Sequence, residues 1–170
     1  QRQMCIRDRG AAGLTIDSVA RAMGISKGGV QYCFGSKDAM IDAMFDRWGK
    51  AYERVFDEIA GENPSATTSV QAHLQATRSS DQASSAKAAG LMATLIQTPE
   101  HLDSTREWYR SRIAGLDLTT EEGKRARLAF LATEGAFMLR YFGLMEIDPA
   151  EWDAMFADMQ TLILQDVQSR

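Results

Sequence analysis

Residues 15–37 restrict the possible folds of this chain most strongly, because two short helix patterns follow each other there with a single glycine between them. Thr15 is a favoured N-cap residue and begins the first pattern. The apolar residues that share one face of this first helix are Ile16, Val19, Ala20 and Met23. Gly24 can adopt the positive φ that ends such a helix, and Ser26 can cap the next one. Two short helices joined by a tight glycine turn predict a helix-turn-helix.

The second helix pattern opens with Lys27, Gly28 and Gly29, an uncommon start for a helix that only has to pack. Two adjacent glycines cost about 2 kcal/mol of helix propensity relative to alanine. A helix N-terminus without side chains lets another molecule approach its backbone closely, and its free N–H groups favour phosphate. A plain corner between two helices would explain the apolar positions but not the lysine and the glycines. We therefore expect this segment to bind double-stranded DNA.

The composition of the chain indicates an all-α protein. Helix-favouring residues are abundant, and only three prolines interrupt 170 residues. A hydrophobic fraction of 45% and a charged fraction of 25% exclude a wholly disordered chain. No apolar stretch approaches the roughly 20 residues that span a bilayer, and no charged start leads into an apolar signal segment. We therefore expect a cytoplasmic protein with no membrane partner.

The residues that usually carry chemistry are scarce. Two cysteines, Cys5 and Cys33, cannot form a disulfide framework. The two histidines, His73 and His101, are too few for a multi-histidine metal site, and we expect both at the surface or at helix ends. The sequence shows no Ser/His/Asp set, metal-ligand cluster, paired buried carboxylates or phosphate loop. These observations predict a protein that is not an enzyme and that has no cofactor.

Charge is distributed unevenly along the chain. Residues 1–50 contain eight Lys+Arg and five Asp+Glu, a net charge of +3, whereas residues 51–170 contain eleven and eighteen, a net charge of −7. A basic first part on an acidic body is typical of a small module that faces an anion. The excess is small, so it supports nucleic-acid binding only together with the helix-turn-helix pattern.

Residues 10–48 resemble the DNA-binding region of TetR/AcrR-family transcriptional regulators. The residues that carry this resemblance are Gly10, Thr15, Val19, Ala20, Gly24, Ile25, Ser26, Lys27, Gly28, Tyr32, Phe34, Ser36, Lys37, Asp38, Ala39 and Met40. The resemblance implies a helix-turn-helix DNA-binding domain over residues 1–47 and a helical-bundle ligand-binding and dimerisation domain over residues 48–170. It further implies a homodimeric regulator, usually a repressor, that binds a palindromic operator and leaves it when a small-molecule effector binds.

The resemblance also implies which residues face DNA: Thr15, Ser26, Lys27, Gly28, Gly29, Gln31, Tyr32, Cys33 and Lys37. Lys27 and the two glycines would open the recognition helix toward base edges or phosphates in the major groove. Lys37 would hold a phosphate from the start of the next helix. Gln31 departs from the family, which usually has a tyrosine there. Its amide could read an adenine edge or bond to a phosphate, and the sequence does not decide between the two.

Residues 1–9 do not fit the amphipathic first helix of that family. Met4, Cys5 and Ile6 lie together and do not repeat at helical spacing, and the chain starts without a methionine. We therefore expect the first helix to be truncated or replaced, by foreign sequence or at the edge of a fragment. A short or irregular first helix would loosen the DNA-binding part of the protein.

The remaining sequence predicts a helical body. The expected helices span residues 36–60, 65–79, 86–97, 100–116 and 119–142, with a last helix that begins at 148, and a polar loop covers 79–85. The last two helices have apolar faces wide enough for a core and a partner. The residues expected in a dimer interface are Leu128, Leu131, Gly135, Trp152, Met155, Phe156, Met159 and Ile163. The alternative is that these faces form only the core of the domain.

A ligand pocket is expected among aromatic and methionine side chains of the body, which suit an apolar effector. The candidates are Met92, Leu95, Trp108, Tyr109, Phe137, Met138 and Tyr141. Plain core packing is the alternative for each of them. Two other functions also stay open for the whole chain: a helical interaction protein without DNA binding, and a helical enzyme with an incidental helical corner.

Overall fold

The structure is a computed structural model that describes residues 15–96 and 99–164, and all of the regular secondary structure in these ranges is helical. The helices are α2 (Ile16–Met23), α3 (Lys27–Phe34), α4 (Lys37–Ala60), α5 (Ala66–Ser79), α6 (Gln82–Leu95), the short 3-10 helix η2 (Pro99–His101), α7 (Asp103–Ile113), α8 (Glu121–Tyr141) and α9 (Pro149–Leu164). The prediction of an all-α protein is confirmed. No helix in the described ranges is both long and apolar enough to cross a membrane.

Three hydroxyl N-caps in succession begin α2, α3 and α4. The backbone N–H of Ser18 donates to Thr15 Oγ1 at 3.0 Å, and that of Gly29 donates to Ser26 Oγ at 3.0 Å. The N–H of Ala39 donates to Ser36 Oγ at 3.1 Å. Gly24, with φ of 69°, ends α2, and this backbone conformation favours glycine. The local sequence thus sets where the helices of the predicted helix-turn-helix begin and end.

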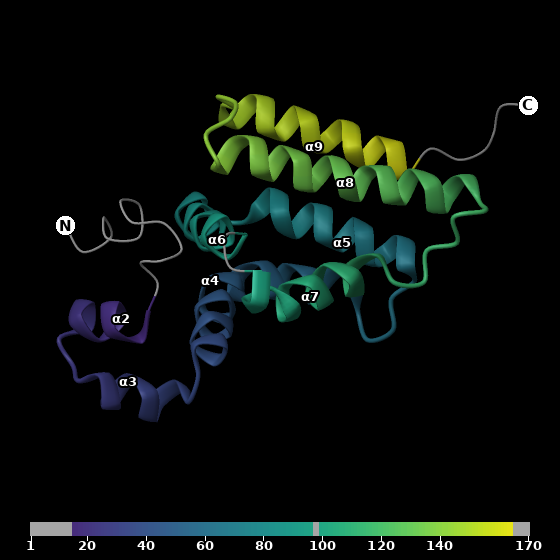
Figure 1. Ribbon diagram of the computed structural model, residues 1–170. Helices are drawn as coiled ribbons and strands as arrows, with labels where there is room; N and C mark the ends of the chain where they lie inside the picture. The colour runs from purple at the N-terminus through teal and green to yellow at the C-terminus, as the bar shows by residue number, and fades with distance from the viewer. Residues whose placement is uncertain (1–14, 97–98, 165–170) are drawn as a thin grey trace, which may run out of the picture.

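The helix-turn-helix packs on the body through α4 and α6. Val30 of α3 is fully buried and belongs to one core cluster with Ala20, Met40 and Ile41. Leu91 and Leu95 of α6 complete this cluster. In Figure 1, α2 and α3 lie at one end of the molecule, and α4 leads from them into the body. The recognition helix is therefore supported by the same helices that form one end of the body.

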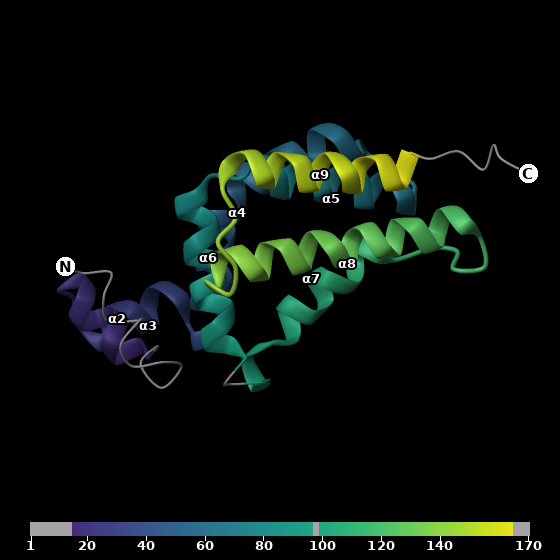
Figure 2. The ribbon, with the colours of Figure 1, turned by 90° about the horizontal axis from the view of Figure 1, so that it is seen from above.

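Helix α5 lies at the centre of the body. It contacts α4 and α7 on one side and α8 and α9 on the other, as Figures 1 and 2 show. Val70, Ala72 and Leu74 are almost completely buried, because a central helix has no face left for solvent. Helices α8 and α9 form the outer pair. The side chains with which α9 covers the core are Trp152, Phe156, Met159 and Ile163.

Several predicted boundaries differ from the structure. Helix α6 begins at Gln82, so the predicted loop over 79–85 shrinks to Ser80 and Asp81. The reason is a cap: the Asp81 carboxylate accepts the N–H of Ser84 at 2.9 Å. The predicted helix over 100–116 is wrong at both ends, because η2 precedes α7 and α7 ends at Ile113.

Two expectations about domain organisation are not tested by the structure. Helix α4 runs without interruption across residues 47 and 48, so the expected boundary between a DNA-binding and a ligand-binding domain falls inside one helix. The boundary stays a prediction. The expectation of an irregular first helix concerns residues 1–9, which lie outside the described ranges, as does Cys5.

Candidate nucleic-acid interface and ligand cavity

Helix α3 has one buried face and one exposed face. Val30 and Phe34, four residues apart, point inward, and Val30 is completely buried. Lys27, Gly28, Gln31 and Tyr32 are exposed, and Tyr32 has 95% of its surface accessible. The pairs 27/31 and 28/32 are each four residues apart, so these side chains share the outer surface of the helix. Cys33 is also exposed.

Thr15 and Ser26, two of the predicted DNA contacts, are also helix caps. This structural role leaves their hydroxyl groups able to donate a hydrogen bond. Thr15 Oγ1 and Ser26 Oγ each accept a backbone N–H as helix caps. A hydroxyl that accepts a hydrogen bond still carries its own O–H and can donate it to a phosphate oxygen. Both residues are exposed, so the caps leave this contact with DNA sterically open.

The two lysines of the predicted interface differ in their surroundings. Lys27 Nζ lies 3.2 Å from Asp17 Oδ2, and both side chains are more than half exposed. An ion pair this exposed is weak, so Lys27 can exchange Asp17 for a phosphate at little cost. Lys37 is the first residue of α4 and is half-buried. Its backbone is therefore fixed by the helix that continues into the body.

The glycines that open α3 are not required by packing inside the protein. A Cβ atom at Gly28 would meet nothing nearer than Ser26 Oγ, at 3.9 Å, and one at Gly29 would lie 3.4 Å from the same atom. Gly28 is exposed and has an ordinary helical backbone. Another molecule can therefore come close to the backbone of α3 at Gly28 from the solvent side.

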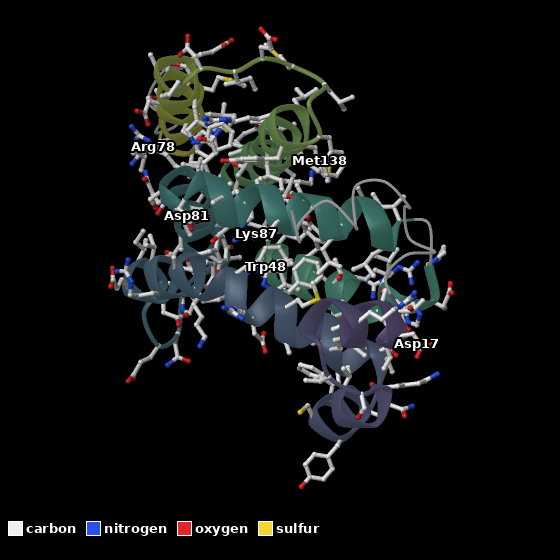
Figure 3. The ribbon with its side chains drawn as sticks, turned by 90° about the vertical axis from the view of Figure 1, so that its left-hand side faces the viewer. Asp17, Trp48, Arg78, Asp81, Lys87 and Met138 are labelled. Carbon is white, nitrogen blue, oxygen red and sulfur yellow. The ribbon has the colours of Figure 1, made fainter. Side chains whose placement is uncertain are left out.

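The body contains a cavity of about 370 Å³ between α4, α5, α6, α7 and α8. Four of the predicted ligand residues line it: Met92, Trp108, Tyr109 and Phe137. The other three do not. Leu95 is completely buried in the cluster that supports α3, Tyr141 packs on Phe137 and Trp152, and Met138 of α8, labelled in Figure 3, lies outside the lining.

His73 lies at the cavity and not at the surface, so the expectation for this residue was wrong. It sits on the central helix α5 and is 1% exposed. The Tyr52 hydroxyl is 2.7 Å from Nδ1 of His73, and Nε2 is 2.9 Å from Oε1 of Glu134. Within the described residues, that Nε2 makes no hydrogen bond of good geometry. The signal that could have placed it there is the helical spacing of Val70, His73 and Leu74, which puts the three residues on one face.

Two tyrosines complete this polar group. The Tyr109 hydroxyl donates to Oε2 of Glu134 at 2.9 Å. Burial is the main reason why the pKa values of Tyr52 and Tyr109 lie far above the ordinary value of 10.0. For Tyr109 the neighbouring Glu134 carboxylate raises the pKa further. Both phenols therefore stay protonated at neutral pH and remain hydrogen-bond donors. Tyr52 and Glu134 were not predicted as site residues, because each lies on a predicted helix without a motif.

An ion pair between a largely buried arginine and a half-exposed glutamate holds the aromatic wall of the cavity in place. Arg112 Nη2 donates to both carboxylate oxygens of Glu53, at 2.7 and 2.8 Å. The same carboxylate accepts the indole N–H of Trp108 at 3.1 Å. The guanidinium group lies over the ring of Phe56, 3.9 Å from its centre. These contacts fix the orientation of Trp108 where it faces the cavity.

The predicted dimer residues fall into two groups. Trp152, Phe156, Met159 and Ile163 belong to the core of the protomer and are nearly inaccessible, because α9 turns this face toward α5 and α8. Leu128 and Leu131 of α8 are 54% and 57% exposed, while Gly135 and Met155 are intermediate. Further large apolar side chains are exposed on α8, after it and on α9: Leu139, Leu144, Met145 and Leu164.

His101, the remaining histidine, lies at the end of η2, as expected for a helix-end residue. Its Nδ1 contacts Oδ1 of Asp38 on α4. The described residues contain no group of three or more His, Cys, Asp and Glu side chains that could hold a metal ion.

An exposed, glycine-opened recognition helix, joined by one continuous helix to a helical body with a cavity, defines the chain as a DNA-binding transcriptional regulator. Two family models match it. One, described as bacterial regulatory proteins of the tetR family, matches residues 3–44. The other, described as a tetracyclin repressor-like C-terminal domain, matches residues 67–164, more than half of the chain. The chain belongs to the TetR family, whose regulators bind DNA and are not enzymes. A search of curated proteins gave no match.

Proposed function

We propose that this protein is a cytoplasmic homodimeric repressor that binds a palindromic operator through α3 and leaves it when a small molecule occupies the cavity. One observation carries the proposal: α4 belongs to both sites. It begins at Lys37, next to the recognition helix, and it supplies Asp42, Phe45, Trp48 and Tyr52 to the cavity wall. A ligand that displaces α4 must also move the support of α3.

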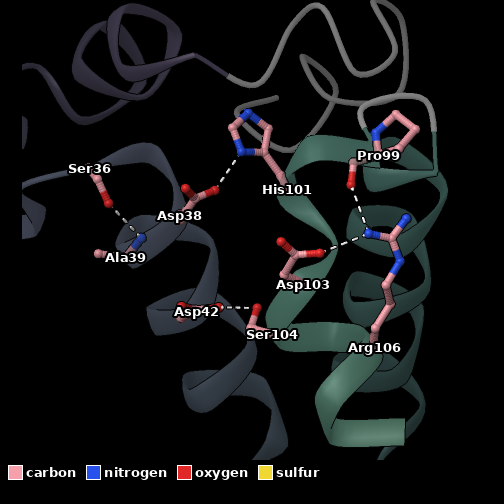
Figure 4. A network of polar contacts seen from close by, with 9 residues as sticks. All are labelled: Ser36, Asp38, Ala39, Asp42, Pro99, His101, Asp103, Ser104 and Arg106. Carbon is pink, nitrogen blue, oxygen red and sulfur yellow. Dashed lines mark hydrogen bonds and ion pairs between the residues drawn. The ribbon is translucent and has the colours of Figure 1, made fainter. Parts of the chain in front are cut away.

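Two contacts join the first turns of α4 to η2 and to the start of α7. His101 of η2 contacts Asp38, and the Ser104 hydroxyl of α7 donates to Asp42 at 2.8 Å. Figure 4 shows these contacts one turn apart along α4. Asp42 and Ser104 also line the cavity. A ligand that enters between α4 and α7 thus touches one of the contacts that set the position of α4.

A dimer is proposed because one recognition helix reads too few base pairs for an operator. A symmetric pair binds two half-sites, and the palindrome mirrors the two-fold axis. The exposed leucines of α8, Leu128 and Leu131, are the predicted interface residues that remain available at the surface of the protomer. Large exposed apolar side chains on neighbouring turns mark a protein contact.

The test is selection of duplexes from a random-sequence pool, followed by fluorescence anisotropy with the enriched sequence. We expect a palindrome, a stoichiometry of two chains per site, and an affinity that falls steeply with salt because phosphate contacts release counterions. Changing Gln31 or Tyr32 to alanine should alter the enriched sequence. No enriched sequence, or binding that does not depend on salt, would favour the alternative of an interaction protein that does not bind DNA.

A further inference from the structure

The cavity is lined by more acidic than basic side chains. Its carboxylate residues come from α4, α8 and the turn before α6: Asp42, Asp46, Glu53, Asp81 and Glu134. Among the described residues that line it there is no lysine or arginine, and His73 is the one side chain that can carry a positive charge. This distribution creates a negative potential inside the cavity.

Nearby basic residues balance only part of this charge. Glu53 is paired with Arg112, which lies outside the lining. Asp81 caps α6 and lies near Lys87, and Figure 3 labels both residues. Asp42, Asp46 and Glu134 remain, and His73 can balance one of them at most, even when it is protonated. Ser104 donates to Asp42 but carries no charge, so this hydrogen bond leaves the negative potential unchanged.

The buried end of the cavity combines a carboxylate with an incompletely bonded imidazole. Glu134 is only 13% exposed, so water screens its charge poorly. His73 Nε2 is buried and lacks a hydrogen bond of good geometry within the described part of the chain. A buried carboxylate without full compensation destabilises the protein unless a positive group lies close to it. The Tyr109 hydroxyl bonds to the Glu134 carboxylate but carries no charge, so this end of the cavity would attract the positive group of a ligand.

Aromatic rings form much of the remaining wall. The ring centres of Tyr52 and Trp108 are 5.6 Å apart, and those of Trp108 and Tyr109 are 5.1 Å apart. Phe45, Trp48 and Phe137 also line the cavity. The faces of aromatic rings attract cations, and the interaction strengthens when the cation leaves water. The carboxylates and the aromatic rings thus both favour a positively charged ligand.

We propose that the cavity binds an organic cation with an apolar or aromatic body, its positive group placed near Glu134 and its body against Tyr52 and Trp108. This inference rests on the proposed function, in which the cavity is the effector site, and it replaces the expectation of a purely apolar effector with a charged class. A volume of about 370 Å³ suits a small organic molecule. An anion would be repelled by the carboxylates, and a neutral molecule would gain no attraction from the charge of Glu134.

The test uses three probes of equal shape and different charge on the full chain without DNA. They are benzyltrimethylammonium, its neutral isostere neopentylbenzene, and the anion benzylsulfonate, each measured by calorimetry and by quenching of tryptophan fluorescence. We expect the cation to bind at least about tenfold more tightly than the neutral isostere, and the anion to bind most weakly. In Glu134→Gln and in Asp42→Asn, affinity for the cation should fall about tenfold while affinity for the neutral isostere stays constant.

Asp158→Asn is the matched control, because it removes an exposed carboxylate of α9 that does not line the cavity. It should leave all three affinities unchanged. Thermal melts of each variant separate a loss of binding from a loss of folding. Equal or tighter binding of the neutral isostere, preferred binding of the anion, or no binding of any probe would each overturn the inference.

A separate DNA measurement keeps the two proposals apart. If the cation binds with the expected charge preference but does not lower the anisotropy of the selected duplex in complex with the protein, the result supports the cation site and contradicts release of DNA by the effector. If the duplex binds as proposed but the cation binds no more tightly than the neutral isostere, the proposed regulator is supported and the cation inference is contradicted.

Discussion

Nδ1 of His101 contacts Oδ1 of Asp38, although 63 residues separate them in the sequence. Asp38 lies in the first turn of α4, directly after the recognition helix, and His101 ends η2. The contact therefore ties the start of α4 to the segment between α6 and α7 (Figure 4).

His101→Ala should loosen the start of α4 more than it lowers global stability. Asp38 is mostly exposed, so the contact contributes at most about 1 kcal/mol to the free energy of unfolding. Amide hydrogen exchange over residues 38–44 should accelerate, because this contact opposes local opening. Arg106→Ala is the control, since Arg106 bonds to Asp103 and to the Pro99 carbonyl and does not touch α4. Equal acceleration in both variants would contradict the assigned role.

Gly28→Ala should stabilise the protein and weaken its binding to DNA. The backbone at Gly28 is helical and a new Cβ would meet only Ser26 Oγ at 3.9 Å, so the gain in helix propensity, about 1 kcal/mol, is not opposed by a clash. The same methyl group would keep DNA away from the start of α3. Chemical denaturation and anisotropy measure the two effects. Gly90→Ala on α6, where a new Cβ would meet no atom within 4 Å and which does not line the cavity, should be stabilising without a loss of DNA affinity.

Lys37→Ala should weaken binding to all duplexes by a similar factor. A lysine that contacts a phosphate carries no sequence information, so its removal lowers affinity uniformly. The slope of log affinity against log salt should become shallower by about one unit, because one fewer counterion is released. Lys124→Ala, on α8 and paired with Glu121, is the control and should leave the slope unchanged. An unchanged slope in Lys37→Ala would remove this residue from the interface.

Leu131→Glu should convert a dimer to a monomer without unfolding the protomer. Leu131 is 57% exposed, so a charge is tolerated there in the isolated chain but not in an apolar interface. Sedimentation equilibrium measures the change, and affinity for the palindrome should fall because one half-site is lost. Leu118→Glu, exposed in the turn before α8, is the matched control. A variant that remains dimeric would exclude Leu131 from the contact.

Stability should fall in acid, and Asp117 should be part of the reason. Hydrogen bonds from the Thr119 side chain and backbone lower the pKa of Asp117 below its ordinary value of 3.8. A lowered pKa in the folded state stabilises the protein above pH 3.8, and this contribution is lost as the pH falls through the folded pKa. Asp117→Asn should therefore destabilise the protein at pH 7, and the difference should shrink below pH 3.8. Urea unfolding of both proteins between pH 7 and pH values below 3.8 measures this difference in the free energy of unfolding.

Local sequence alone determined the DNA-binding part of the molecule. Thr15, Ser26 and Ser36 cap helices, and Gly24 adopts a positive φ, because these choices depend on the nearest few residues. The exposed start of α3 follows from the same pattern. For this reason the family resemblance, the all-α fold and the helix-turn-helix could all be predicted.

Tertiary structure decided which apolar faces are buried and what lines the cavity. The stripe of α9 predicted as a partner surface is core, because α5 and α8 cover it, and no periodicity distinguishes a core face from a partner face. His73, Tyr52 and Glu134 come from three helices and meet only when α4, α5 and α8 pack together. The charge of the cavity is likewise a property of that packing, since Glu134 of α8 and Asp81 before α6 join the carboxylates of α4 only in the folded protein.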